Sequence, residues 1–473
     1  MKKRLLSVLL VAVLCLGMSM TSYAAPQITP EEQPPADLTE EELKAFQTEQ
    51  LKKYYDMPIA TNDIKGWPQG PGTYGEAAIV MEVGTGAILY GKNVDDQHYP
   101  ASITKVLTAL IALENGQLSD SVTFSHDCVS FLQPGDSSVG LKENNVITLE
   151  QTLYATLLAS ANEAAYAVAE NVGKNAGHDY QWFIEQMNAR CKELGGSNSN
   201  FVNANGLHDE NHYTSARDMA LIGRELFKHP EFFEIVQTKQ YEIPASDTCQ
   251  QHIFQQKHKM LQPDNSNYYE YAIGGKTGYT SDALSTLITM ADNGNLKLVC
   301  VVLRTHGKNI YPDTTNLFNY AFENFQKIAI KDQETSEDIS EILEDASGEN
   351  CGYVVVPKGV EFSDLDMEMK VDKENNDEAV LTYTYEGGLV GSARAKVSEK
   401  YKKEHTASVK KQEKNSDKNS DNKEDASGKK SLTKKLIIVF IAVLLLLVLL
   451  FIIRLIQYRR RMKRKRRRRR RRR

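Results

Sequence analysis

The pattern Ser102-Ile103-Thr104-Lys105 has the residue types and the spacing to activate a serine as a nucleophile. Residues three apart lie on one face of a helix, so the Lys105 amine could reach the Ser102 hydroxyl. A lysine that accepts a proton must be neutral, and burial, a second cation and a helix N-terminus all lower a lysine pKa. The same spacing occurs four more times near the C-terminus, beginning at Ser408, Ser420, Ser427 and Ser431. Ser102 differs from these because Pro100 precedes it and an apolar helix is predicted over residues 106–113.

Two further motifs could complete such a site. Ser160-Ala161-Asn162 interrupts an Ala-rich helical stretch with two short polar residues, which favour caps and turns. An ordinary break between two core helices explains that pattern equally well. Lys276-Thr277-Gly278 follows Gly274-Gly275 and precedes Tyr279-Thr280. Glycines allow a strand edge to approach a ligand closely, while the lysine supplies a cation and the threonine a hydroxyl suited to a carboxylate.

Together and in this order, the three motifs resemble those of the serine-type D-alanyl-D-alanine carboxypeptidases, the low-molecular-mass penicillin-binding proteins of peptidase family S11. The resemblance covers residues 75–325, and residues 328–400 resemble the C-terminal β domain of that family. The stretches that carry it are Tyr99-Pro100-Ala101-Ser102-Ile103-Thr104-Lys105, Leu158-Ala159-Ser160-Ala161-Asn162-Glu163-Ala164, Phe201-Val202-Asn203-Ala204-Asn205-Gly206-Leu207, Gly275-Lys276-Thr277-Gly278-Tyr279-Thr280 and Val354-Val355-Val356-Pro357-Lys358-Gly359.

The resemblance implies an enzyme that removes the terminal D-alanine from peptidoglycan stem peptides through an acyl-enzyme, and that β-lactam antibiotics acylate. Ser102 would be the nucleophile and Lys105 the general base that takes its proton. Ser160 would relay a proton to the departing D-alanine, and the oxyanion would rest on the backbone N–H groups of Ser102 and Tyr279. The implied catalytic residues are Ser102, Lys105, Ser160 and Asn162, and the implied substrate-binding residues are Lys276, Thr277, Gly278 and Tyr279.

One departure from the family concerns binding of the substrate carboxylate. Relatives often place an arginine just before the segment that corresponds to Tyr311-Pro312-Asp313-Thr314, and this chain has Asn309-Ile310 there. Arg304 or Lys308 is a possible substitute. The departure therefore bears on the efficiency of the carboxypeptidase reaction.

The elements expected around these motifs indicate an α+β fold. A hairpin is predicted over residues 77–90 with alternating apolar residues and a turn at Gly84-Thr85-Gly86, and helices are predicted over residues 148–159, which open on a capping box, and 178–194. Strands over residues 285–290 and 296–303 are joined by Asn293-Gly294-Asn295, a hairpin signal. Strands before and after a block of helices favour an antiparallel sheet flanked by helices plus a helical subdomain, the β-lactamase/DD-peptidase-like arrangement that the resemblance also implies. Alternating strands within residues 351–398 indicate a small all-β domain.

The two ends of the chain predict its location. The net charge of −5 combines +3 in residues 1–24, −25 in residues 25–433 and +17 in residues 434–473. The N-terminus has the basic start, short apolar run and small residues of a signal peptide, and residues 436–453 form an apolar run long enough to span a bilayer as a single transmembrane helix. The positive-inside rule then leaves the arginine tail in the cytoplasm and the catalytic domain outside a cell membrane, in a host that leans towards Gram-positive.

The expected organisation and partners follow from these assignments. The expected segments are a signal peptide at 1–24, an acidic Pro-rich stalk at 25–72 with a short helix near residues 40–54, a catalytic domain at 73–327, a β domain at 328–400, a disordered linker at 401–433, a transmembrane helix at 434–456 and a poly-Arg tail at 457–473. The tail lacks residues that could read bases, so anionic lipid is favoured over nucleic acid and no specific nucleic acid is expected. His126, His208 and His212 lack metal-ligand spacing, so neither a metal nor another cofactor is expected.

Two other functions remain open at this level. A serine β-lactamase would need an efficient deacylating base, and Glu163 lies beside the second motif but within a helix, while residues 198–206 contain no glutamate. A non-catalytic module that keeps the penicillin-binding fold is the other alternative. The intact Ser102, Lys105 and Lys276 argue against it.

Overall fold

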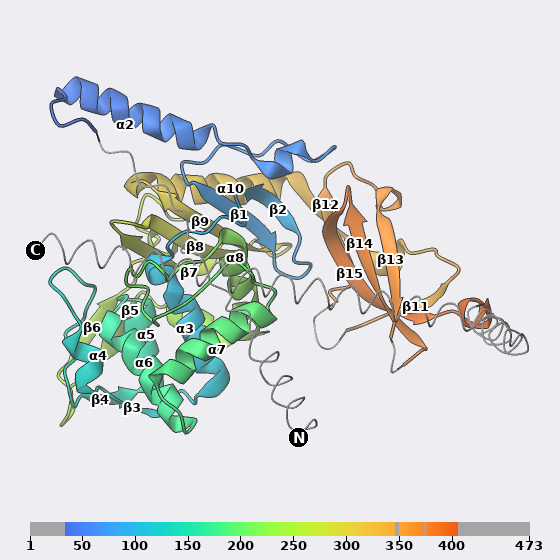
Figure 1. Ribbon diagram of the computed structural model, residues 1–473. Coiled ribbons are helices and arrows are strands. Elements are labelled where there is room, and N and C mark those ends of the chain that lie inside the picture. Colours follow the sequence, from blue (N-terminus) through green and yellow to red (C-terminus); the bar gives the residue numbers. More distant parts are fainter. Residues whose placement is uncertain (1–33, 346–349, 373–374, 405–473) are drawn as a thin grey trace, which may run out of the picture. The chain divides into compact units, whose positions relative to one another are not determined.

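A five-stranded antiparallel sheet forms the centre of the catalytic domain (Figure 1). The computed structural model describes residues 34–345, 350–372 and 375–404. The strands stand in the order β2-β1-β9-β8-β7 and are β1 (Ala77–Glu82), β2 (Ile88–Lys92), β7 (Ala272–Thr280), β8 (Leu284–Asp292) and β9 (Lys297–Thr305). Both predicted hairpins, β1–β2 and β8–β9, are confirmed. The antiparallel sheet brings the Lys276 motif on β7 to one edge.

Helices cover both faces of this sheet. α8 (Ala216–Glu225) packs on one face and α10 (Ile310–Asn324) on the other. Successive residues of β1 therefore enter two different cores, with Ile79 in the core that includes α8 and Val80 in the core that includes α10. Every residue of β1 is buried, so the alternating pattern understated the burial of this strand. The predicted sheet flanked by helices is confirmed.

The helical subdomain carries the first two motifs. Its helices are α3 (Thr104–Asn115), α4 (His126–Ser130), α5 (Leu149–Leu157), α6 (Asn162–Asn175), α7 (Tyr180–Glu193) and α9 (Pro230–Gln237), and its small ribbons are β3–β4 (Ser121–Thr123 with Val146–Thr148) and β5–β6 (Gln240–Ile243 with His252–Gln255). The predicted capping box opens α5: Gln151 N donates to Thr148 Oγ1 at 3.1 Å and Thr148 N donates to Gln151 Oε1 at 2.9 Å. The second motif lies between α5 and α6, so the predicted helix break is confirmed.

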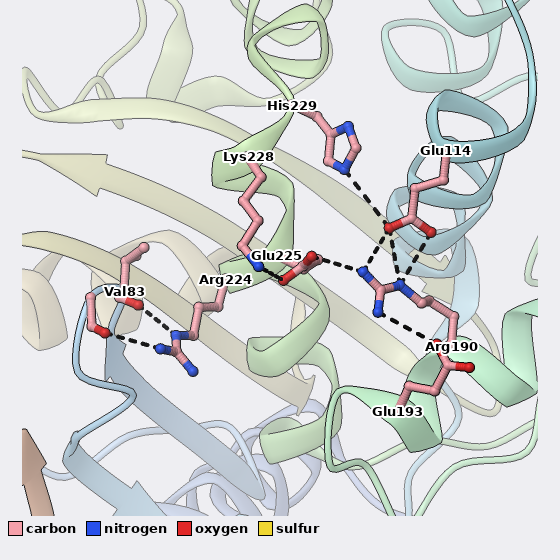
Figure 2. Close-up of polar contacts among 9 residues, drawn as sticks. Val83, Glu114, Arg190, Glu193, Arg224, Glu225, Lys228 and His229 are labelled. Atoms are coloured by element: carbon pink, nitrogen blue, oxygen red, sulfur yellow. Dashed lines mark hydrogen bonds and ion pairs between the residues drawn. The ribbon is translucent and has the colours of Figure 1, made fainter. Parts of the chain in front are cut away.

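A charged network fixes the C-terminal end of α3 (Figure 2). Arg190 of α7 donates to Glu114 of α3 and to Glu225 of α8, each at 2.8 Å. The preceding residue of α8, Arg224, donates to the carbonyls of Val83 and Gly84 beyond β1. These side chains are largely shielded from solvent, where ion pairs are screened less than on an open surface. The network thus ties α3 to α7, α8 and the β1–β2 hairpin, and α3 carries Lys105 at its other end.

The segment before the sheet is partly integrated into the catalytic domain. α2 (Glu40–Tyr55) confirms the predicted short helix, and a 3-10 turn (Ala60–Asp63) follows it. Tyr54 and Trp67 are buried, and Trp67 Nε1 donates to the Leu89 carbonyl at 2.9 Å. Packing against the catalytic domain thus begins at Tyr54, within the range 25–72 that was predicted as a stalk.

A second antiparallel sheet follows the catalytic domain. It has six strands in the order β10-β12-β15-β14-β13, with β11 paired to β15. They are β10 (Phe325–Ala329), β11 (Ile339–Leu343), β12 (Tyr353–Pro357), β13 (Asp366–Val371), β14 (Glu378–Tyr385) and β15 (Gly388–Val397). The predicted all-β region is confirmed, although its first strand begins at Phe325 rather than at residue 328.

The remaining predicted segments lie largely or wholly outside the described residues. They are the signal peptide, most of the linker, the transmembrane helix at 434–456 and the poly-Arg tail. Within residues 34–345, 350–372 and 375–404, no helix is both long and apolar enough to cross a membrane. All five cysteines in these ranges are free thiols.

Candidate active site

Ser102 lies in a tight turn that leads into α3. It occupies a 3-10 turn (Ala101–Ile103) rather than the α-helix expected for the first motif, and α3 begins two residues later. Residues i and i+3 of a 3-10 turn are eclipsed, so this turn still directs Ser102 towards Lys105. The Ser102 Oγ lies 2.9 Å from the Lys105 Nζ. The predicted pairing of the two side chains is confirmed.

The backbone around this turn is unusual. Ala101 has a φ of +51°, a left-handed conformation that alanine rarely adopts and that is often held at functional sites by surrounding structure. Gly206 supplies part of that support, because a Cβ on Gly206 would lie 1.9 Å from the Ala101 carbonyl oxygen. Only glycine allows the segment containing Asn205 to pass this close to the nucleophile turn.

Lys105 is fully buried and has three polar neighbours. Its Nζ lies 2.8 Å from Asn162 Oδ1 and 2.5 Å from the Asn205 carbonyl oxygen, in addition to Ser102 Oγ. Burial and the nearby Lys276 charge hold the pKa of Lys105 well below its ordinary value. A neutral amine has two N–H groups, which the two acceptors can take. Its lone pair is then available to the Ser102 hydroxyl, as a general base requires.

Ser160 and Lys276 form the second hydrogen-bonded pair of the site. Ser160 stands at the break between α5 and α6 with a φ of +62°, and its Oγ accepts from Lys276 Nζ at 2.9 Å. Lys276 also donates to the Thr277 carbonyl at 2.7 Å. Burial and the charge of Lys257 lower the pKa of Lys276 to about 7. The helix break is therefore part of the site, which the residue pattern alone left undecided.

Strand β7 passes directly beside the nucleophile. A Cβ on Gly278 would lie 2.3 Å from Thr286 Oγ1 and 2.9 Å from the backbone nitrogen of Ser102. A side chain at this position would push the strand away from the Ser102 N–H group. The next residue, Tyr279, has a side chain that is 68% exposed. The backbone of β7 at Gly278 thus lies close to the Ser102 N–H group.

The predicted residues surround a cleft of about 340 Å³. It is lined by Ser102, Ser137, Ser160, Lys257, Thr277, Gly278, Tyr279, Ser285, Thr286, Leu287, Gly307, Ile310 and Tyr311. Lys105, Asn162 and Lys276 are buried behind these residues and reach the cleft through Ser102 and Ser160. All eight predicted residues therefore meet in one place.

Sequence reasoning missed three polar residues of the site. Asn205 lies within one of the stretches that resemble the family, residues 201–207, so the sequence of that stretch could have indicated it. Ser137 and Lys257 lie outside any motif. Lys257 is exposed in the cleft, and its Nζ contacts the Ala159 carbonyl and lies 3.2 Å from Ser137 Oγ. It contributes a third lysine to the site.

The substitutes considered for the family arginine do not lie in the cleft. Arg304 is only 4% exposed, and its Nε lies 3.4 Å from Glu76 Oε1. Lys308 is absent from the cleft lining, although Gly307 and Ile310 belong to it. The exposed cation in the cleft is Lys257 instead.

Two of the histidines considered as metal ligands contact protein side chains. His212 is buried, its Nε2 lies 2.9 Å from Thr104 Oγ1, and burial lowers its pKa to about 3. His208 stacks edge-on against Tyr99. No group of three or more His, Cys, Asp or Glu in the described part of the chain could hold a metal ion.

Comparisons with known proteins agree with this geometry. D-alanyl-D-alanine carboxypeptidase DacF of Bacillus subtilis is 31% identical over 261 residues, which are 53% of this chain and 63% of DacF, so the match spans less than two thirds of that relative. D-alanyl-D-alanine carboxypeptidase DacA of Haemophilus influenzae is 27% identical over 70% of this chain and 84% of DacA. The crystal structure of the Streptomyces K15 DD-transpeptidase aligns with a TM-score of 0.50 and 27% identity over 54% of this chain and all of that one.

The family assignment covers all three motifs. Residues 68–307 match the Peptidase S11 family, described as D-alanyl-D-alanine carboxypeptidase. This range is half of the chain and extends from the segment before β1 to the turn after β9. The chain therefore belongs to the S11 family of serine-type D-alanyl-D-alanine carboxypeptidases.

Proposed function

We propose that this protein removes the terminal D-alanine from peptidoglycan stem peptides through an acyl-enzyme on Ser102. The observation that carries the proposal is the contact of Lys105 Nζ with both Ser102 Oγ and Asn162 Oδ1 at the back of an open cleft. A buried lysine with a lowered pKa beside a serine hydroxyl is an activated nucleophile–base pair. The family places this chemistry on D-alanyl-D-alanine peptides.

The proposed acylation step uses both hydrogen-bonded pairs. The Ser102 oxygen attacks the carbonyl carbon between the two D-alanines as its proton moves to Lys105 Nζ. The oxyanion is held by the N–H groups of Ser102 and Tyr279, and donors of this kind are typically worth about 3 kcal/mol of barrier each. The C–N bond then breaks, and the proton taken up by Lys105 passes through Ser160 to the leaving amine. Water attacks the ester carbonyl and gives a proton to Lys105, the C–O bond to Ser102 breaks, and this proton returns to the Ser102 oxygen.

The far end of the cleft would receive the terminal carboxylate. Thr277 offers a hydroxyl there, and Lys276 and Lys257 offer positive charge. The pKa of Lys276, lowered to about 7, would rise when the carboxylate binds because an opposite charge favours the protonated lysine. Lys257 would take the place of the arginine that relatives often carry. A β-lactam would present its own carboxylate in the same way and acylate Ser102.

Membrane anchoring is part of the proposal and rests on the sequence. The signal-like start and the apolar run at 436–453 support a single-pass cell-membrane protein with its catalytic domain outside. The proposed linker at 401–433 would tether the catalytic domain to this helix, and the arginine tail would bind anionic lipid on the cytoplasmic side.

A transpeptidase is the second candidate, favoured by the alignment to the whole Streptomyces K15 DD-transpeptidase. The two reactions share the acyl-enzyme and differ in whether water or an amine attacks it. A β-lactamase is disfavoured because Glu163 Oε1 accepts hydrogen bonds from Ser138, Val139 and Gly140 and Glu163 does not line the cleft.

The test uses the full chain in detergent with a stem pentapeptide that ends in D-Ala-D-Ala. Release of D-alanine by the wild type, with none from Ser102→Ala, is the expected result. Added glycine as acceptor separates the two candidates, because a transpeptidase would form the glycine-ended peptide in place of the hydrolysed one. Equal release by wild type and Ser102→Ala would contradict the proposal.

A further inference from the structure

Glu163 is a buried carboxylate directly beside the catalytic machinery. It follows Asn162 in the first turn of α6 and is fully buried. Its Oε1 accepts from Ser138 Oγ at 2.7 Å, from Val139 N at 2.8 Å and from Gly140 N at 3.1 Å. One side-chain oxygen thus fixes three consecutive residues of the loop that precedes β4.

The loop held by Glu163 forms a wall of the catalytic cleft. Ser137 lines the cleft, its carbonyl accepts from Asn162 N at 2.8 Å and its hydroxyl donates to the Ala159 carbonyl at 3.1 Å. Lys257 Nζ lies 3.2 Å from the same hydroxyl. Residues 137–140, called the wall loop below, therefore connect Glu163 to Lys257 and to the backbone of the second motif.

The Glu163 charge acts on several titratable groups around the site. These groups are Lys105 on α3, Lys257 after β6 and the Cys128 thiol on α4. Asp136, which precedes the wall loop, also acts on Lys105, and Lys276 on β7 is hydrogen-bonded to Ser160. Burial and then Lys276 lower the pKa of Lys105, while the Glu163 charge opposes this shift. Burial lowers the pKa of Lys257, and Glu163 opposes that shift too.

The second oxygen of Glu163 strengthens this interpretation. Oε2 is buried and finds no hydrogen-bond partner among the described residues. A buried carboxylate is costly unless cations or hydrogen bonds compensate its charge. A positive charge on a nearby lysine is costly to shield from water for the same reason, so the carboxylate and the lysines it faces reduce the cost of burying each other.

We propose that Glu163 is a positioning residue for the acyl-transfer reaction: it holds the wall loop that carries Ser137 against the cleft, and its charge balances the charges of Lys105 and Lys257. The proposal rests on the proposed function. It adds a carboxylate that acts through Lys105, Ser137 and Lys257 without touching substrate.

Asp218 provides a matched control. It is a buried carboxylate in the first turn of α8, and it also holds a loop, accepting from Ser197 N, Asn198 N and Ser199 Oγ at 3.3, 2.8 and 2.7 Å. Glu163 acts on Lys105 and Lys257, whereas Asp218 does not figure among the charges that act on Lys105, Lys257 or Lys276. Asp218→Asn therefore removes a carboxylate charge that anchors a loop, as Glu163→Gln does, but at a position remote from the catalytic lysines.

The readout is the rate at which a fluorescent penicillin acylates the full chain, measured across pH. This rate depends on Ser102 and Lys105 whatever peptide the enzyme cleaves, so it tests the inference even if D-alanine release fails. Glu163→Gln keeps an oxygen that can accept from the wall loop but removes the charge. The acid limb of its acylation rate–pH profile should move to lower pH by about one unit. Loss of the Glu163 charge lowers the pKa of Lys105, and a charge several ångströms away in a protein interior changes a pKa by roughly that amount. Asp218→Asn should keep the wild-type midpoint.

A second variant tests the anchoring role and remains informative if Glu163→Gln does not fold. Glu163→Asp keeps the charge but withdraws it by one methylene from the wall loop. It should keep the wild-type midpoint and raise the penicillin concentration needed for half-maximal acylation rate about threefold, the effect of weakening one positioning contact. A Glu163→Gln midpoint equal to that of Asp218→Asn would overturn the charge-balancing role. A Glu163→Asp profile identical to wild type would overturn the anchoring role.

Discussion

Two fully buried lysines, Lys105 and Lys92, occupy opposite kinds of environment in the same domain. Lys105 stands behind the nucleophile with a second lysine, Lys276, close by. Lys92 ends β2 in the region where the N-terminal segment packs against the sheet. Both side chains lose all contact with solvent, so burial alone cannot distinguish them.

Their neighbours do distinguish them. Lys92 Nζ donates to the carbonyls of Tyr54, Thr73 and Gly75 at 2.6, 2.8 and 2.8 Å. Burial lowers the pKa of Lys92 to about 8, and the charges of Asp313 and Glu76 oppose this shift. For Lys105, burial and a cationic neighbour act in the same direction and hold the pKa well below its ordinary value. The surrounding carbonyl oxygens therefore suit Lys92 to a structural role. The neighbouring Lys276 charge and the Ser102 hydroxyl suit Lys105 to act as a base.

The largest expected effect comes from removing the base. Lys105→Ala should lower the rate of acylation by a fluorescent penicillin by about 10³-fold, the usual contribution of a general base. Lys92→Met should leave the rate per folded molecule within about threefold of wild type, because its effects should be on stability. Rapid-mixing fluorescence with the folded fraction measured separately makes the comparison.

Equal losses of acylation rate in Lys105→Ala and Lys92→Met would contradict the distinction between a catalytic and a structural lysine. Such a result would mean either that Lys92 acts in catalysis or that Lys105 mainly stabilises the fold. Circular dichroism of Lys105→Ala supplies the control, since a folded but unreactive protein is the expected state.

The second effect concerns the folding free energy. Lys92→Met should lower the free energy of unfolding by about 3 kcal/mol at pH 7, because it leaves three buried carbonyls without their donor and Asp313 without its cation. Urea unfolding followed by tryptophan fluorescence measures the change, and Trp67 lies in the same packed segment. A variant as stable as wild type would show that the oxygen cage adds nothing over an apolar side chain.

The pH dependence of this difference has a defined sign. The pKa of Lys92 is about 8 in the folded chain and near 10.5 when unfolded, so between these values the unfolded chain binds more protons. Stability rises with pH wherever the unfolded state holds more protons. The advantage of Lys92 over Met should therefore grow from about pH 8 to pH 10.5, and a shrinking advantage would contradict the assigned shift.

The same contrast explains what could be predicted from the sequence. The three motifs and the residue that follows the third predicted the eight site residues, and turn signals such as Asn293-Gly294-Asn295 predicted the hairpins. Motifs and turns could be recognised because each depends on a few adjacent residues. Lys92 and Lys257 lie outside any motif, and the motif stretch that contains Glu163 does not reveal what its carboxylate binds. Their roles depend on partners 17 to 120 residues away in the chain, which only the folded structure brings together. The packing of Tyr54 and Trp67 was missed for the same reason, because an acidic Pro-rich composition concealed two buried aromatic residues.

The smallest effect should come from Lys257, which is neither enclosed by oxygens like Lys92 nor paired with the nucleophile like Lys105. As an exposed cation in the cleft, it should contribute an interaction with the substrate carboxylate of about 0.7 kcal/mol, as solvent-accessible ion pairs do. Lys257→Gln should therefore raise KM for D-alanine release about threefold with little change in kcat. Lys259→Gln removes an exposed lysine two residues on that lies over the Tyr311 ring and does not line the cleft, and it should leave KM unchanged. If both variants leave KM at the wild-type value, the carboxylate is bound by Lys276 and Thr277 alone, and Lys257 belongs with the structural lysines.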